Sequence, residues 1–151
     1  MPNILVIDDS GLIRLKMRKI LEEEKYMVFE GTNLNVLIRG TFSKDISIKD
    51  LDLIILDIYL KNENGLDILR YLTEKHPQIP VIMISVEGKK EIVMKALELG
   101  AKDFLIKPLN KKVLLNRIKA YTDKKQDVKK EKEKIDKEDP YKNNRKSLKE
   151  Y

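Results

Sequence analysis

Three acidic residues close two apolar runs of the sequence. Asp8 and Asp9 end the run NILVIDD, and Asp57 ends the run LDLIILD. Such runs are typical of buried parallel strands, and open parallel sheets bind ligands beyond the carboxyl ends of their strands. Three carboxylates gathered at one edge would repel one another by roughly 4 kcal/mol per pair at about 4 Å and an effective dielectric of about 20. A hard, oxygen-seeking cation, most plausibly Mg²⁺, would relieve that repulsion.

Two further apolar runs end in a hydroxyl group and an ammonium group. PVIMIS stops at Ser85, and KDFLIKP stops at Lys107, which Pro108 follows. An anionic group on Asp57 would meet Ser85 as a hydrogen-bond donor and Lys107 as a compact positive charge. The sequence therefore indicates a site for a divalent cation and a phosphoryl group.

The elements that must position these residues follow from the spacing of apolar residues. Runs of strand length alternate with stretches of helical period, which is the signature of βα units and a parallel sheet. We expect five strands, at about residues 3–8, 26–30, 51–56, 81–85 and 103–106, with a polar link near residues 43–50. Five helices are indicated by groups of apolar positions: Ile13, Met17, Ile20 and Leu21; Leu34, Leu37 and Ile38; Ile68, Leu69 and Leu72; Ile92, Val93, Ala96 and Leu97; and Val113, Leu114, Ile118 and Tyr121. We expect the four residues of the fourth group to lie on the inner side of their helix.

Taken together, these residues resemble the response-regulator receiver family of two-component signalling over about residues 3–122. The residues that carry the resemblance stand in the order Asp8-Asp9, Asp57, Ser85 and Lys107-Pro108, and the loop DIYLKNENGLDIL is similar as well. The resemblance implies an α/β, flavodoxin-like, doubly wound sheet of five parallel strands in the order 2-1-3-4-5, with five helices. That order sets the first and third strands about 4.8 Å apart, so that their acidic ends meet. It also implies a cis peptide bond before Pro108.

The resemblance assigns a chemical role to the acidic residues. Asp57 would be the nucleophile that attacks the phosphorus of a phosphohistidine on a sensor histidine kinase, or of a small phosphodonor. Asp9, Asp57 and the backbone carbonyl of Tyr59 would bind Mg²⁺ directly, and Asp8 would act mainly through a bound water. The chain would then be a signalling phosphoacceptor with self-catalysed phosphotransfer and dephosphorylation, rather than an enzyme.

The remaining site residues would hold the phosphoryl group and respond to it. Lys107 and Ser85 would bind its oxygens, with help from the backbone N–H groups of Tyr59 and Val86. Ser85 would move inward as a switch, and Phe104 would follow by burial alone, because phenylalanine lacks a hydroxyl group. The resemblance places the output surface on the fourth helix, fifth strand and fifth helix.

Three residues depart from the family's usual pattern. Lys61 stands where proline is common, Asn64 where aspartate is frequent, and Val86 where a small residue is usual. We hypothesise that the bulk of Val86 restricts access to Asp57 and slows both phosphorylation and hydrolysis. The lone histidine, His76, is interpreted as a surface residue and not as a phosphorelay histidine.

Composition limits the other classes of function. The 151 residues include no cysteine, show no signal peptide and contain no apolar stretch near the roughly 20 residues that span a bilayer, so we expect a cytoplasmic protein. Residues 123–151 hold 11 Lys or Arg against 8 Asp or Glu, and only Val128, Ile135 and Leu148 are aliphatic there. We therefore expect a receiver domain at residues 1–122 and a charged tail at 123–151, either a helical extension up to Asp139-Pro140 or disordered, with no output domain.

Two alternatives to phosphoryl transfer stay open at this point. The chain could be a receiver-like docking module that never turns over phosphate, for which Val86 and Lys61 leave room. It could also be a regulator whose basic tail, with the groups KKEKEK and NNRK, binds nucleic acid in a salt-dependent manner. The sequence leaves the cognate kinase, the downstream target, the phosphoryl lifetime and the oligomeric state undetermined.

Overall fold

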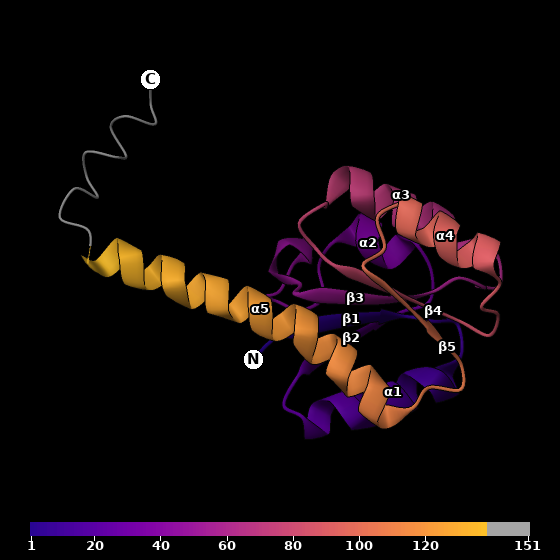
Figure 1. Cartoon of the computed structure of the whole chain (residues 1–151), viewed down its shortest axis with the longest axis horizontal. Coiled ribbons are helices and arrows are strands. Elements are labelled where there is room, and N and C mark those ends of the chain that lie inside the picture. Colours follow the sequence, from indigo (N-terminus) through magenta and orange to yellow (C-terminus); the bar gives the residue numbers. More distant parts are fainter. Residues whose placement is uncertain (139–151) are drawn as a thin grey trace.

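A computed structural model describes the backbone of residues 1–138, and the side chains of residues 1–123 together with Glu131 and Lys134. Five parallel strands form one sheet in the order β2-β1-β3-β4-β5 (Figure 1). Their bounds are β1 Asn3–Ile7, β2 Met27–Gly31, β3 Leu53–Asp57, β4 Val81–Ser85 and β5 Asp103–Ile106. This is the predicted doubly wound, flavodoxin-like α/β fold.

Helices cover both faces of the sheet. They are α1 Gly11–Glu23, α2 Asn35–Arg39, α3 Gly65–Lys75, α4 Lys90–Glu98 and α5 Lys111–Glu138. Figure 1 shows α1 and α5 on one face and α2, α3 and α4 on the other. Each face has its own apolar cluster, and the strands β1, β3 and β4 contribute buried residues to both clusters. That double burial explains why these strands read as nearly continuous apolar runs.

Three apolar positions assigned to helices lie on the surface instead of in the core. Ile38 is 62% exposed, Leu97 48% and Val113 44%. In α5 the residues that face the sheet are Leu114, Leu115 and Ile118. Leu115 was not among the apolar positions predicted for this helix, whereas the exposed Val113 was. Neighbouring apolar residues on a helix fit two faces equally well, and only the position of the sheet decides between them.

The link between α2 and β3 is more ordered than its polar sequence indicated. Thr41 and Ser47 form an isolated antiparallel bridge, and the Phe42 ring lies 5.6 Å from the Phe29 ring, between ring centres. A 3-10 helix, Ile48–Asp50, follows, with a capping box between Ser47 and Asp50. This turn occupies the residues just before β3, which therefore begins at Leu53 and not at residue 51 as predicted.

Helix α5 runs beyond the sheet. It continues past Thr122 to Glu138, while residues 139–151, including the Asp139-Pro140 pair expected to end the helix, lie outside the described residues. Among the helices that the structure describes, none combines the length and apolar character that a membrane span needs.

Candidate phosphoacceptor site

The carboxyl ends of β1 and β3 bring the three acidic residues together. The two strands pair with Ile7 opposite Leu56, so Asp8 and Asp57 leave the sheet side by side. One carboxylate oxygen each from Asp8, Asp9 and Asp57 lies within 4.8 Å of the others. Asp8 is fully buried, Asp57 is 4% exposed and Asp9 is exposed, so the cluster opens to solvent on one side.

Lys107 lies across two of these carboxylates. Its Nζ donates to Asp8 Oδ2 at 2.8 Å and to Asp57 Oδ2 at 2.9 Å. β5 ends at Ile106, and the peptide bond between Lys107 and Pro108 is cis, as the resemblance implied. The lysine thus reaches the acidic cluster from the sheet's far edge strand, with β4 between β5 and β3.

Burial and charge act on these groups in opposite directions. Burial raises the pKa of Asp57, and the neighbouring charge of Asp8 adds to that rise, while the hydrogen bond and charge of Lys107 work against it. Burial disfavours the charged form of Lys107, but the hydrogen bonds and charges of Asp8 and Asp57 outweigh it and raise the pKa of Lys107. The acidic cluster therefore keeps Lys107 protonated, but the single positive charge of Lys107 leaves part of the negative charge of the cluster uncompensated.

Backbone groups support the acidic cluster. Asp8 Oδ1 accepts a hydrogen bond from the Ser10 N–H at 2.9 Å, and the guanidinium of Arg14 donates to the Asp8 backbone carbonyl. Ser10 also caps α1, because its Oγ accepts from the Ile13 N–H at 3.3 Å. These contacts fix the turn that presents Asp8 and Asp9.

Ser85 stands at the end of β4, beside β3. Asp57 pairs with Ile84 in the sheet, so Ser85 lies one residue further along the neighbouring strand. Its side chain is buried, and its Oγ accepts a hydrogen bond from the Glu87 N–H at 3.1 Å. Val86, which follows it, is 64% exposed. Phe104 is half-buried and packs against the apolar cluster beneath α3 and α4.

The loop after β3 is held tightly against the site. The Tyr59 N–H donates to Asp57 Oδ1 at 3.2 Å, and Tyr59 pairs with Asn64 in an isolated bridge. Asn64 caps α3 through its side-chain oxygen, so asparagine performs there a role that aspartate also performs. Lys61 is exposed. A side chain at Gly65 would place its Cβ 2.1 Å from the Asp57 carbonyl oxygen, which explains the glycine.

The acidic cluster fits a magnesium ion by its chemistry. Its three carboxylates are hard oxygen donors close enough to share one ion, and Lys107 supplies only a single positive charge against them. Asp8, Asp9 and Asp57 are therefore the residues of the described chain that would hold Mg²⁺.

Two polar side chains at this edge, those of Tyr59 and Glu87, form a contact that was not predicted from the sequence. The hydroxyl group of Tyr59 donates to Glu87 Oε2 at 3.0 Å, joining the loops that follow β3 and β4. Tyr59 had been considered only for its backbone groups, and Glu87 not at all. Glu87 lies in a short exposed loop without apolar period, so no sequence pattern marks it.

The fold and this acidic edge define an α/β domain of the signalling type in which a strand-end aspartate lies between acidic neighbours and a lysine. The family profile described as the response regulator receiver domain matches residues 4–119. The chain belongs to this family, and so it carries the receiver domain of two-component response regulators.

Individual relatives agree with the family assignment. The chain is 36% identical over 120 residues to the transcriptional regulatory protein CpxR of Escherichia coli K12; the match covers 80% of this chain and 49% of CpxR, so it spans about half of that relative. It is 35% identical over 115 residues to the chemotaxis protein CheY of Treponema pallidum, covering 76% of this chain and 78% of CheY. A chain in the crystal structure of the CheX-CheY-BeF3-Mg²⁺ complex from Borrelia burgdorferi has a TM-score of 0.71 and 27% identity, with 79% of this chain and 87% of that chain covered.

Proposed function

We propose that this protein is a response regulator that accepts a phosphoryl group on Asp57 and then changes its binding to a partner protein. The observation that carries the proposal is the position of Asp57, at the end of β3, with the ammonium group of Lys107 2.9 Å from its carboxylate and two further acidic residues beside it. The donor would be a phosphohistidine of a sensor histidine kinase or a small acyl phosphate. We place this reaction in the cytoplasm, in keeping with a chain that has no cysteine.

The chemistry is a single displacement at phosphorus. A carboxylate oxygen of Asp57 forms the new O–P bond while the P–N bond of the phosphohistidine breaks, and the imidazole leaves with the electron pair and takes up a proton. A Mg²⁺ ion held by Asp9, Asp57 and the Tyr59 carbonyl, with Asp8 acting through water, would neutralise negative charge on the transferred group. Water later attacks the same phosphorus, the O–P bond to Asp57 breaks, and inorganic phosphate leaves as the carboxylate is restored.

Residues on β4 and β5 would stabilise the phosphorylated form. Lys107 can exchange one of its two carboxylate contacts for a phosphoryl oxygen without leaving the site. The hydroxyl group of Ser85 would donate to another phosphoryl oxygen, with the N–H groups of Tyr59 and Val86 beside it. The inward movement of Ser85, followed by Phe104, would alter the surface formed by α4, β5 and α5, where we expect the partner to bind.

The test is phosphorylation of the purified protein by acetyl phosphate with Mg²⁺, followed by intact mass spectrometry. We expect a gain of about 80 Da, one phosphoryl group, in the native protein. Asp57→Ala and addition of EDTA should both abolish the gain, whereas Asp67→Asn, which changes an exposed aspartate on α3, should not. A gain that persists in Asp57→Ala would disprove Asp57 as the acceptor. No gain with acetyl phosphate or with candidate kinases would favour a docking module that does not turn over phosphate.

A further inference from the structure

The side chain of Arg14, in the first turn of α1, reaches back to the turn that carries Asp8 and Asp9. One nitrogen of its guanidinium donates to the backbone carbonyl of Asp8, and its Nε donates to Glu30 Oε1 at 3.1 Å. Glu30 lies on β2 beside β1, opposite Val6 in the register of the two strands. Arg14 therefore joins the acidic turn to the neighbouring strand.

A second arginine keeps the Glu30 carboxylate in place. Arg18, one turn further along α1, donates to Glu30 Oε2 from Nε at 3.0 Å and from Nη2 at 2.7 Å, and it also donates to Glu22 at 2.7 Å. The side chain of Arg14 is 19% exposed and that of Glu30 is 32% exposed, so their pair is shielded from much of the solvent. Because the donors of a guanidinium group stand in a rigid fork, the bond to Glu30 fixes the direction in which Arg14 meets the acidic turn.

The carbonyl that Arg14 holds belongs to the peptide group between Asp8 and Asp9. Because a peptide group is planar, the direction of this carbonyl sets the plane from which the Asp9 residue departs. The Asp8 carboxylate has restraints of its own, since it accepts from Lys107 Nζ at 2.8 Å and from the Ser10 N–H at 2.9 Å. Within the part of the chain that the structure describes, no donor binds the exposed carboxylate of Asp9. The backbone of the turn is therefore what positions Asp9.

We infer that Arg14 is a positioning residue for the Mg²⁺ site. By holding the Asp8 carbonyl, and by being held in turn by Glu30, it keeps the Asp9 carboxylate where it can share the ion with Asp57. This role rests on the proposed function, in which Asp9 is a direct ligand of Mg²⁺. The ion pair of Arg14 is with Glu30 and not with a carboxylate of the acidic cluster, so Arg14 acts on the ion through the backbone of the turn.

A purely electrostatic role for Arg14 has the opposite sign. A positive charge beside the acidic cluster repels Mg²⁺, so removal of the charge alone would tighten binding of the ion. Loss of a positioning contact would weaken binding, because the turn that carries Asp9 must then be ordered when the ion binds. Arg14→Met removes the charge and the donors together and keeps a side chain of similar bulk, so the direction of its effect separates the two roles.

The first measurement is calorimetric titration of the full-length protein with Mg²⁺. Arg14→Met should weaken binding about three- to tenfold, the factor that corresponds to the net free energy of one hydrogen bond. Arg18→Met is the matched control, because it removes an equal charge and another partner of Glu30 from the same helix, while the contact with the Asp8 carbonyl belongs to Arg14. This control should bind Mg²⁺ as the native protein does. An Arg14→Met protein that binds Mg²⁺ as tightly as the native protein, or more tightly, would overturn the inference.

Glu30 provides a second variant, at a distance from the turn itself. Glu30→Ala releases Arg14 from β2 and should weaken Mg²⁺ binding about twofold or more. If Glu30 acts through Arg14, the double variant Arg14→Met/Glu30→Ala should bind Mg²⁺ no more weakly than Arg14→Met alone. Additive losses would overturn this connection, since an effect of the Glu30 charge on the ion would act whether or not Arg14 is present.

The second measurement needs neither metal nor phosphoryl transfer. In EDTA, hydrogen exchange of the Ser10 N–H, which donates to Asp8 Oδ1, reports opening of the turn and is followed by NMR. Relative to the N–H of Ile55 in β3, it should be about three- to tenfold faster in Arg14→Met than in the native protein or in Arg18→Met. An equal rate would overturn the positioning role. If the native protein bound no Mg²⁺, the proposed metal site would fail, and exchange at Ser10 would decide separately whether Arg14 fixes the turn.

Discussion

Lys107 illustrates how a single residue balances opposing demands at this site. Its Nζ contacts Asp8 Oδ2 and Asp57 Oδ2, so it stabilises two buried carboxylates that would otherwise repel each other. The same contacts occupy oxygens that a bound cation would share. Lys107 therefore raises the stability of the metal-free protein and lowers its affinity for the cation.

Replacing this lysine tests that balance. Lys107→Met should tighten Mg²⁺ binding about three- to tenfold, because a competing positive charge is removed, and should lower the melting temperature in EDTA. Phosphorylation by acetyl phosphate should fall at least about tenfold, since the phosphoryl oxygens lose a cationic partner. Calorimetric titration with Mg²⁺ checks the affinity, with the exposed Lys102→Met as control. Unchanged affinity would contradict the competition.

The ionised Asp57 carboxylate should cost stability when no metal is present. Burial raises the pKa of Asp57, so the folded state binds this proton more tightly than the unfolded state does. Stability from this group is then lost as the pH rises from the ordinary value of 3.8 through the raised one. Asp57→Asn should therefore raise the melting temperature in EDTA at pH 7 by about 3–5 °C, equivalent to about 1 kcal/mol. A melting temperature that falls would refute this sign.

Replacing Val86 tests whether this side chain restricts access to Asp57. If its bulk obstructs Asp57, Val86→Ala should speed both phosphorylation and hydrolysis about two- to threefold. The side chain is 64% exposed, so folding should be unaffected. The phosphorylation rate is measured by quenching the reaction with acetyl phosphate at successive times. The hydrolysis rate is measured from the loss of phosphorylated protein after the donor is removed. Unchanged rates would refute the hypothesis that Val86 restricts access to Asp57.

Sequence alone indicated the residues that end strands, and it failed where residues lie in loops. Asp8, Asp57, Ser85 and Lys107 each follow an apolar run, and parallel strands carry their carboxyl ends to one edge, so their meeting there could be predicted. Glu87 contacts Tyr59 only because two loops fold toward each other. That contact depends on backbone paths that no local pattern specifies.

At the level of elements, close packing between a helix and a strand end shapes the site. α3 begins directly against β3, and the Gly65 N–H donates to the Ile58 carbonyl at 2.7 Å. A Cβ at this position would lie 2.1 Å from the Asp57 carbonyl oxygen. The first residue of α3 therefore has no room for a side chain.

Gly65→Ala should consequently disturb both stability and the loop that carries Tyr59. Because the clash is with backbone, we expect a loss of about 2–3 kcal/mol in the free energy of unfolding, measured by urea denaturation. Gly11→Ala at the start of α1 is the matched control, since its nearest contact to an added Cβ is 3.7 Å away. Equal stability of the two variants would show that the loop yields easily.

Strands were easier to predict than helix faces, for a physical reason. A strand buried on both sides needs only an apolar run, whereas a helix face depends on which of several apolar residues meets the sheet. Leu97 was assigned to the inner side of its helix for that reason and is exposed. The bridge between Thr41 and Ser47 was missed because pairing across a short loop leaves no periodic signal.

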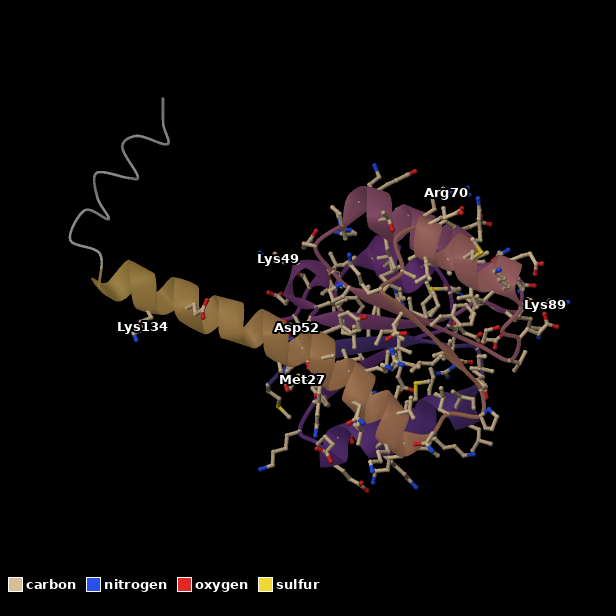
Figure 2. The ribbon with its side chains drawn as sticks, viewed as in Figure 1. Met27, Lys49, Asp52, Arg70, Lys89 and Lys134 are labelled. Carbon is tan, nitrogen blue, oxygen red and sulfur yellow. The ribbon has the colours of Figure 1, made fainter. Side chains whose placement is uncertain are left out.

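The candidate site and the carboxyl end of the described part of α5 lie on opposite sides of the domain. Figure 2 shows Lys89, in the loop after β4, at the opposite end of the sheet from Met27 and Asp52, which lie at the amino ends of β2 and β3. The part of α5 that carries Lys134 extends further in the direction away from Lys89. The extension therefore leaves the domain on the side remote from the acidic cluster.

Among the α5 residues whose side chains the structure describes, contacts with the rest of the domain extend to Thr122. Leu114, Leu115 and Ile118 are buried in the cluster beneath α1 and α5. The Tyr121 hydroxyl donates to the Lys102 carbonyl at 2.8 Å, and Thr122 Oγ1 lies 3.3 Å from the Tyr26 hydroxyl. The boundary between a receiver domain at 1–122 and a charged tail at 123–151 stays a prediction, which a truncated chain tests.

A chain that ends after Thr122 should consequently fold and accept phosphate as the full chain does. We expect its melting temperature to lie within about 3 °C of the full-length value, because the buried side chains that the structure describes in α5 all lie at or before Thr122. Its labelling rate with acetyl phosphate should be unchanged. A chain that ends after Arg117 is the control; it loses Ile118, Tyr121 and Thr122 and should be destabilised by about 3 kcal/mol or more. If removal of residues 123–151 alone lowered the melting temperature as much as the shorter chain does, the tail would have to pack on the domain, and the division at residue 122 would be wrong.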